Sequence, residues 1–166
     1  MPRVNDYVNY STHGICKIED LRFIKFDSCA SGHDYYVLKP IARDTSSIFV
    51  PADNPVLMER MRPVLFPEEI DQIILSVKDQ NLLWISDRKQ RSAQFQEILR
   101  TRDERELLLL ISCLYLKSTE TEKGLSNTDA QVLKKAESII DQEFSFSLKI
   151  STSSIGSYIR ERLGLK

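Results

Sequence analysis

The chain has 166 residues, of which 42% are hydrophobic and 28% are charged, a composition typical of a soluble globular protein and not of a disordered tail. Its formal net charge is −1, and the charges balance on both sides of residue 65: residues 1–65 carry eight Lys/Arg and eight Asp/Glu, and residues 66–166 carry fifteen and sixteen. Bulk charge therefore excludes a general attraction to nucleic acid or to a membrane surface, so any DNA contact needs a local patch or a partner.

The cysteines and the apolar segments indicate an intracellular protein. Cys16, Cys29 and Cys113 lie far apart without a CxxC spacing, so we expect free thiols in a reducing cytoplasm rather than a disulfide framework or a zinc site. The N-terminus lacks the apolar run of a signal peptide, and we expect no export. The most apolar segment, residues 107–116, is too short to span a bilayer and suits a buried helix.

The N-terminal part of the chain has the alternating apolar pattern of short strands. The predicted strands cover residues 7–10, 15–19, 21–26, 34–39 and 47–50. Gly14 is free to take the positive φ that the first tight turn requires, and Pro51 ends the last strand. The pattern predicts a small curled sheet or barrel whose buried face is built from Val8, Tyr10, Ile15, Ile18, Tyr36, Leu38, Ile48 and Val50.

After residue 55 the pattern changes to a helical period. The first predicted helix begins at Pro67, which suits a first helical position. Four further helices are predicted: one from near Asp87, one from a capping box over residues 101–104, one after a cap at residues 126–129, and one over residues 152–163. The apolar stripes of these segments predict a compact bundle of about five helices. We therefore predict an α+β protein with a β domain over residues 1–60 and a helical domain over residues 66–166.

Several motifs resemble a known family in the same order. Val4-Asn5-Asp6-Tyr7-Val8-Asn9-Tyr10, followed by His13-Gly14-Ile15 and a strand ending in Ile18-Glu19, resembles the opening of the RNA-polymerase-interacting domain shared by CarD-type bacterial transcription regulators and transcription-repair coupling factors. Three later segments also resemble the family: Tyr35-Tyr36-Val37-Leu38, Ile48-Phe49-Val50-Pro51, and the stretch from Trp84 to Arg91. The chain departs from the pattern at Asn5, Asn9 and Ser11, where the family prefers glycine, an apolar residue and proline.

The resemblance implies both a fold and a function. The implied fold is a small five-stranded Tudor-like β-barrel followed by a helical bundle. The implied function is that of a non-catalytic bacterial regulator, associated with the nucleoid through RNA polymerase, which binds the polymerase β subunit and modulates promoter open complexes through DNA at the upstream fork. The DNA contact would be weak and independent of base sequence. No membrane, small-molecule substrate, metal or cofactor is implied.

The predicted polymerase contact lies on an edge strand, because unpaired backbone groups on an edge accept a partner's strand. In the family the barrel docks the polymerase along such an edge. Ile48, Phe49 and Val50 are the candidates here, and Arg22 and Lys25 supply polar contacts. The alternative is that Phe49 packs inside the protein, against the helical domain or its own barrel.

The predicted DNA contact combines an aromatic side chain with cations. In the family a tryptophan in this region acts as a wedge against the minor groove, and Trp84 is the only tryptophan here. The alternative is that Trp84 belongs to the core of the bundle. Phosphate contacts are predicted for Arg88, Lys89 and Arg91, and Arg100, Arg102 and Arg105 extend the basic segment. A solvated, charged helix face is the alternative for all of these cations.

Little in the sequence favours catalysis. There are two histidines, and there is no Gly-rich phosphate loop, HExxH or GxSxG motif. A Cys16–His13 pair is conceivable, but no spacing supports it. We therefore expect no catalytic residue. Two alternatives stay open: a protein–protein adaptor of the same fold that does not contact DNA, and a small-molecule enzyme or binding protein that uses a cleft between the domains.

Overall fold

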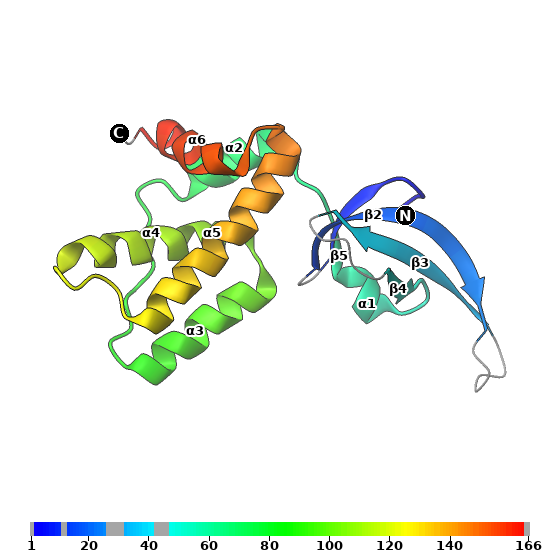
Figure 1. Cartoon of the computed structure of the whole chain (residues 1–166), viewed down its shortest axis with the longest axis horizontal. Helices are drawn as coiled ribbons and strands as arrows, with labels where there is room; N and C mark the ends of the chain where they lie inside the picture. Colours follow the sequence, from blue (N-terminus) through cyan, green and yellow to red (C-terminus); the bar gives the residue numbers. More distant parts are fainter. Residues whose placement is uncertain (1, 11–12, 26–31, 42–46, 165–166) are drawn as a thin grey trace. The chain divides into compact units, whose positions relative to one another are not determined.

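The computed structural model describes residues 2–10, 13–25, 32–41 and 47–164 (Figure 1). The chain divides into two compact units, Met1–Val64 and Leu65–Lys166. Each unit has a hydrophobic core of its own, and the two cores share no residue. The sheet belongs to the first unit and five α-helices belong to the second.

The first unit is built on a five-stranded antiparallel sheet. Its strands are β1 (Tyr7–Tyr10), β2 (Gly14–Ile24), β3 (His33–Pro40), β4 (Ile48–Pro51) and β5 (Met61–Pro63). Their order is β4-β3-β2-β1-β5, so β4 and β5 form the two edges. The predicted α+β class is confirmed, but the sheet is not closed and the predicted barrel is not confirmed.

The strand count of five is reached differently from the prediction. The segments 15–19 and 21–26 were expected to be two strands, but residues Gly14–Ile24 form the single strand β2, with a register shift between Ile18 and Asp20. Such a bulge breaks the two-residue alternation, so one strand reads as two. The fifth strand, β5, has only three residues and ends in proline. So short a segment shows no alternating apolar pattern, and it was therefore not predicted from the sequence. Phe26 lies outside the described residues.

The bulge also decides which side chains share a face. Before it, Ile18 pairs with Leu38, and both are buried in the core. After it, Asp20 pairs with Val37 and Arg22 pairs with Tyr35, which lie on the opposite face. Ile15 pairs with Asn9 and also lies on that opposite face, while its neighbour Cys16 enters the core. Ile15 is buried, as predicted, but it lies on the opposite face and not on the core face.

Two backbone positions explain the N-terminal hairpin. Gly14 has φ 75°, which confirms the positive φ expected at the turn. Asn5 has φ 76°, and asparagine tolerates this left-handed region better than most side chains. The departure from glycine at Asn5 is therefore compatible with the same backbone. From this position the Asn5 backbone N–H donates to the Ile18 carbonyl oxygen at 2.7 Å, which extends the pairing beyond β1.

A short helix that the sequence did not predict completes the first unit. Helix α1 (Pro55–Glu59) begins after Asn54, whose side-chain oxygen accepts a hydrogen bond from the Leu57 backbone N–H at 3.1 Å. Leu57 and Met58 pack against the core of the sheet. Helix α1 follows β4 and leads to β5, so it connects the two edge strands (Figure 1).

The second unit is helical. Its elements are α2 (Pro67–Ser76), α3 (Arg88–Thr101), α4 (Glu104–Glu120), α5 (Asn127–Leu148), the 3₁₀-helix η2 (Thr152–Ser154) and α6 (Ile155–Arg162). The predicted beginning of α2 at Pro67 is confirmed, as is the Ser126 cap of α5, whose hydroxyl oxygen accepts from the Asp129 backbone N–H. Helix α4 is capped by Asp103, whereas Thr101, which was expected to open it, is the last residue of α3.

The core of the second unit comes from all five α-helices. Its largest fully buried side chains are Phe95, Phe144, Ile70, Ile74, Leu107, Leu110, Leu114, Ile140 and Ile155. The apolar segment 107–116 lies within α4, as expected for a buried helix. None of the helices in the described ranges is both long and apolar enough to cross a membrane.

Candidate functional site

Strand β4 is an edge strand, as the docking hypothesis requires. It pairs with β3 through Leu38↔Ile48, Val37↔Phe49, Tyr36↔Val50 and Tyr35↔Pro51. No strand in the described part of the chain pairs with its other side. The free side of an edge strand offers backbone N–H and C=O groups to a partner.

The three apolar residues of β4 differ in where their side chains lie. Val50 is 0% exposed and belongs to the core, and Ile48 packs against that core from its rim. Phe49 is 46% exposed and lies on the other face of the sheet. Of the three, Phe49 has the exposed side chain. Val50 can contact a partner only through its backbone groups, because its side chain is buried.

Arg22 lies on the same sheet face as Phe49. Phe49 pairs with Val37, which pairs with Asp20, and in the next row Tyr35 pairs with Arg22. The Arg22 Nε lies 3.2 Å from the Asp20 Oδ2 in an exposed ion pair. An exposed pair of this kind contributes little stability and can be exchanged for a partner's carboxylate. Lys25 follows the end of β2 and is exposed.

Trp84 is attached to the bundle on several sides. It packs against the core of the second unit, and its ring centroid lies 6.3 Å from that of Phe95. The Arg91 guanidinium carbon lies 4.5 Å from the Trp84 ring centroid, and the Lys117 Nζ lies 4.8 Å from it. Cation–π contacts of this geometry stabilise the ring where it is. The arrangement favours the core interpretation of Trp84 over the wedge interpretation.

Arg91 is engaged inside the protein. It is 8% exposed, and its Nη2 donates to the Asp129 Oδ2 at 3.3 Å. Its Nη1 donates to the carbonyl oxygens of Ile85 and Ser86 at 3.0 and 3.2 Å. The side chain therefore holds the segment before α3 against the start of α5, and little of it is accessible to a phosphate.

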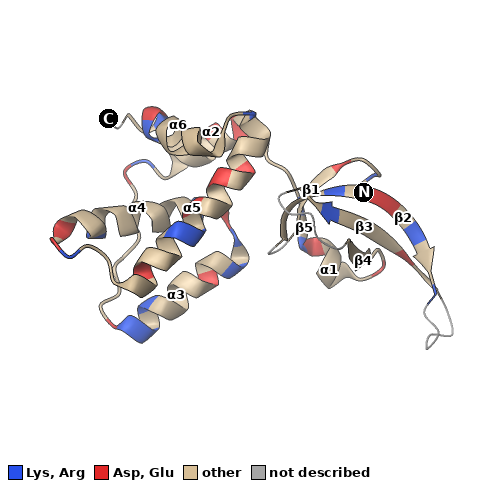
Figure 2. Ribbon diagram, viewed as in Figure 1, with Lys and Arg blue, Asp and Glu red and all other residues tan. Residues whose placement is uncertain are grey.

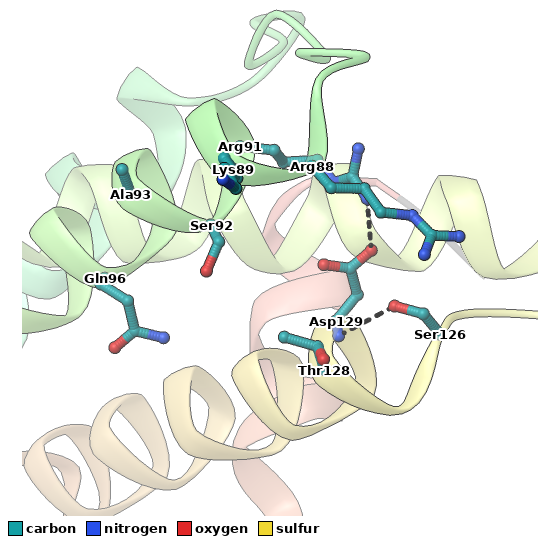
Figure 3. A pocket seen from close by; sticks show the side chains of 9 residues that line it. All are labelled: Arg88, Lys89, Arg91, Ser92, Ala93, Gln96, Ser126, Thr128 and Asp129. Atoms are coloured by element: carbon teal, nitrogen blue, oxygen red, sulfur yellow. Dashed lines mark hydrogen bonds and ion pairs between the residues drawn. The ribbon is translucent and has the colours of Figure 1, made fainter.

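Arg88 and Lys89 are exposed, and they line an open groove. The groove has a volume of about 520 Å³ and lies between the N-terminal parts of α3 and α5 (Figure 3). Arg88 and Lys89 come from α3, and Ser126, Thr128 and Asp129 come from the start of α5. Figure 2 shows the blue of Lys and Arg at the beginning of α3. Two cations beside two helix N-termini make the groove attractive to anions.

The remaining arginines of the basic segment are used elsewhere. Arg100 bonds to Glu97 on the same helix, and this hydrogen bond lowers the pKa of Glu97. Arg105 donates to the Gln80 side-chain oxygen. Arg102 is buried at the C-terminal cap of α3, and its Nε lies 3.9 Å from the Glu143 Oε1. The structure therefore brings Arg88, Lys89 and Arg91 together in one groove, and of these three Arg88 and Lys89 are exposed.

The sequence interpretation missed two residues beside Trp84. Leu83 is 83% exposed, although its two neighbours in the chain pack against the core. Lys117 of α4 reaches the Trp84 ring from more than thirty positions away, so no local motif could reveal it. In the ranges that the structure describes, no group of three or more His, Cys, Asp or Glu residues is placed to hold a metal ion.

Comparison with known proteins identifies the first unit. The family model of the CarD-like/TRCF RID domain matches residues 3–65. This range covers the five strands and α1. No curated protein matches the chain. The RID domain is an RNA-polymerase-interacting domain, so the match implies an interaction with RNA polymerase for the unit that contains β4.

Proposed function

We propose, from the premise that this CarD-like protein carries an RNA-polymerase-interacting domain over residues 3–65, that it regulates transcription without catalysing a reaction. The polymerase β subunit is the proposed partner, and β4 is the proposed docking edge. The second unit then contacts promoter DNA through the groove of Arg88 and Lys89 and changes the stability of the open complex. The observation that carries the proposal is the exposed Phe49 on an edge strand of the matched domain.

A partner strand added beside β4 would bond to its free backbone groups. Affinity in this mode comes from main-chain hydrogen bonds, and specificity comes from side chains on one face. Phe49 is the exposed side chain of β4 itself, so the partner strand should present an apolar residue near Phe49. Arg22 lies on the same face but two strands further into the sheet, so any carboxylate that pairs with it comes from a part of the partner that covers this face and not from the added strand.

Tethering to the polymerase explains how a protein of net charge −1 can act on DNA. Once bound, the chain holds its groove at a high local concentration beside the promoter, and little intrinsic affinity is needed. Contacts from Arg88 and Lys89 to phosphates would be sensitive to salt and independent of base sequence. A change of about 1.4 kcal/mol in open-complex stability alters its population about tenfold, so two such contacts suffice.

The adaptor without DNA contact is the second candidate. It is favoured by the internal positions of Trp84, Arg91 and Arg102, which leave fewer of the predicted DNA contacts on the surface. Enzymatic activity is not part of the proposal. In the groove, the Ser126 hydroxyl caps α5 and the Asp129 carboxylate is paired with Arg91, so neither is placed as a free nucleophile or base.

The docking edge is tested by substituting Phe49 in the full chain. We expect Phe49→Ser to weaken binding of bacterial RNA polymerase about thirtyfold, because loss of an interface anchor costs about 2 kcal/mol. The measurement is biolayer interferometry with immobilised protein and purified core polymerase. Circular dichroism of each variant checks that the fold is kept.

Phe23→Ser is the matched control. Phe23 is 66% exposed on β2, but it pairs with Asp34 and lies on the face opposite to Phe49. Its substitution should leave binding within twofold of the wild type. Equal weakening by both variants would contradict docking at β4, and no binding of the wild-type chain would reject the polymerase hypothesis.

The adaptor is distinguished by a double variant of the groove, Arg88→Ala/Lys89→Ala. If the chain contacts DNA, this variant should bind polymerase normally and lose its effect on open-complex lifetime. If it keeps the full effect, the adaptor is the better description.

A further inference from the structure

The groove between α3 and α5 has the size of a small-molecule site. Its volume is about 520 Å³, which lies within the range of about 300 to 1,000 Å³ that is typical of ligand pockets. Both walls are helices anchored in the core of the second unit, through Phe95 of α3 and Val132 of α5 among others. A ligand would therefore bind between walls that are already in place.

One end of the groove is cationic. Arg88 and Lys89 lie at the beginning of α3, and Ser126 marks the same end on the side of α5 (Figure 3). Both cations are exposed, and in the described part of the chain neither forms an ion pair. Among the described lining residues Asp129 alone carries a carboxylate, and Arg91 neutralises it at 3.3 Å. This end can therefore bind an anion through charge-assisted hydrogen bonds.

The other end of the groove is polar but uncharged. Ser92 and Gln96 extend from α3 toward α5, where Thr128 lies at the beginning of the helix (Figure 3). Gln96 follows Arg88 by eight residues on the same helix, so about 12 Å of helix axis separates the two. A bare phosphate would fill only the cationic end. A nucleotide has both an anionic part and an uncharged part that forms hydrogen bonds.

Arg91 adds an unused donor to the wall of the groove. It is 8% exposed, and its two Nη atoms already bond to Asp129 and to the carbonyl oxygens of Ile85 and Ser86. Its Nε is buried and has no hydrogen-bond partner among the described residues. Because an unsatisfied buried donor costs stability, an acceptor supplied by a ligand at this wall would be favourable.

We propose that the groove binds a free nucleoside polyphosphate, with its phosphates at Arg88 and Lys89 and its nucleoside at the uncharged end. None of the described residues that line the groove is aromatic, so the base cannot stack there and discrimination between bases is weak. The site itself goes beyond the proposed function. Its regulatory consequence rests on that function: nucleotide and promoter DNA need the same two cations, so a bound nucleotide excludes the DNA.

Isothermal titration calorimetry of the full chain, without polymerase or DNA, tests the cationic end with ATP as the probe. We expect Arg88→Ala/Lys89→Ala to weaken ATP binding about tenfold, because charge-assisted bonds to phosphate are lost. Lys134→Ala/Lys135→Ala is the matched control. It removes two exposed cations of α5 that do not line the groove, and it should leave ATP binding within about twofold of the wild type.

Adenosine, inorganic tripolyphosphate and GTP test the rest of the assignment. Adenosine and tripolyphosphate each fill one end only, so each should bind about tenfold more weakly than ATP. Gln96→Ala should weaken ATP binding about fivefold, through the loss of one hydrogen bond, and leave tripolyphosphate binding unchanged. GTP should bind within about threefold of ATP. Circular dichroism checks that each variant is folded.

The outcomes separate this inference from the proposed function. If tripolyphosphate binds as tightly as ATP and Gln96→Ala changes neither, the groove accepts phosphate alone and the nucleotide assignment is overturned. If ATP does not bind the wild-type chain, or if both double variants weaken it equally, the site is overturned. The proposed function fails on different evidence, namely a wild-type chain that does not bind polymerase or does not change open-complex lifetime.

Discussion

At the scale of single residues, buried charge does more in this protein to fix geometry than to bind ligands. Arg91 is the clearest case, since it connects a carboxylate, two carbonyl oxygens and an aromatic ring. Removing one partner of a buried ion pair leaves an uncompensated charge, which costs about 3 to 5 kcal/mol. A basic residue in a basic stretch can therefore either hold the fold together or bind a ligand, and its burial shows which of these two roles it has.

Asp141 should make the stability of the second unit depend on pH. Burial, with a smaller contribution from the charge of Glu137, raises the pKa of Asp141 from 3.8 to about 6. The folded state thus favours the protonated carboxyl, and this contribution to stability is lost as the pH rises from about 4 to 6. Since one pKa unit corresponds to about 1.4 kcal/mol and partial exposure reduces the effect, we expect Asp141→Asn to stabilise by about 1 to 2 kcal/mol at pH 8.

Thermal unfolding of the wild type and Asp141→Asn at pH 3.5 and pH 8, followed by Trp84 fluorescence, measures this difference. At pH 3.5 the gain should nearly vanish, because the wild-type carboxyl is then protonated in the folded state and mostly protonated in the unfolded state. Glu137→Gln is the comparison variant: burial also raises the pKa of Glu137, so this variant should likewise stabilise at pH 8 and lose most of that gain at pH 3.5. A gain from Asp141→Asn that is equal at both pH values would contradict the assignment.

At the scale of elements, the sequence predicted the helices better than the strands. Pro67 and Ser126 mark helix beginnings through local chemistry, so they could be read from the chain. The bulge in β2 and the short strand β5 depend on partners distant in sequence, and alternation alone cannot show them. The candidate site divides in the same way: Phe49 was found on its edge, whereas Leu83 is recognised only once its neighbours are seen to be buried.

Helix α6 offers an element-scale prediction. The Tyr158 hydroxyl donates to the Asp71 Oδ1 at 2.6 Å, and the Arg162 Nε donates to the same oxygen at 2.9 Å. These bonds attach α6 to α2. Tyr158→Phe should lower the free energy of local opening of α6 by about 1 kcal/mol, the net value of one hydrogen bond.

Hydrogen–deuterium exchange of the α6 amides measures that opening. The exchange rates should rise about fivefold in Tyr158→Phe, since 1 kcal/mol corresponds to that ratio. Tyr115→Phe, at an exposed position on α4, is the matched control and should leave α6 unchanged. Faster exchange throughout the second unit, rather than in α6 alone, would show that the bonds support the whole bundle instead.

At the scale of the whole molecule, the two units have separate cores and separate proposed tasks. This separation should be visible in the dependence of promoter opening on protein concentration. Phe49→Ser should raise the half-saturating concentration about thirtyfold and keep the plateau, because it weakens docking alone. Arg88→Ala/Lys89→Ala should lower the plateau and keep the half-saturating concentration.

Titrations of each variant into polymerase–promoter complexes, with open-complex lifetime as the readout, provide these two numbers. A variant that changes both the half-saturating concentration and the plateau would mean that one surface makes both the docking contact and the DNA contact. That result would contradict the division of labour between the units.

The bulge in β2 has a consequence for how this sheet can change during evolution. Side chains along a strand alternate between the two faces of the sheet. The irregularity between Ile18 and Asp20 shifts this alternation by one residue for the rest of β2. Restoring an uninterrupted count would turn Arg22 toward the core side and Leu21 and Phe23 toward the side of Phe49. A one-residue insertion or deletion in this hairpin therefore acts like a frameshift: the residues that follow it in the strand stay the same, but each side chain moves to the opposite face of the sheet.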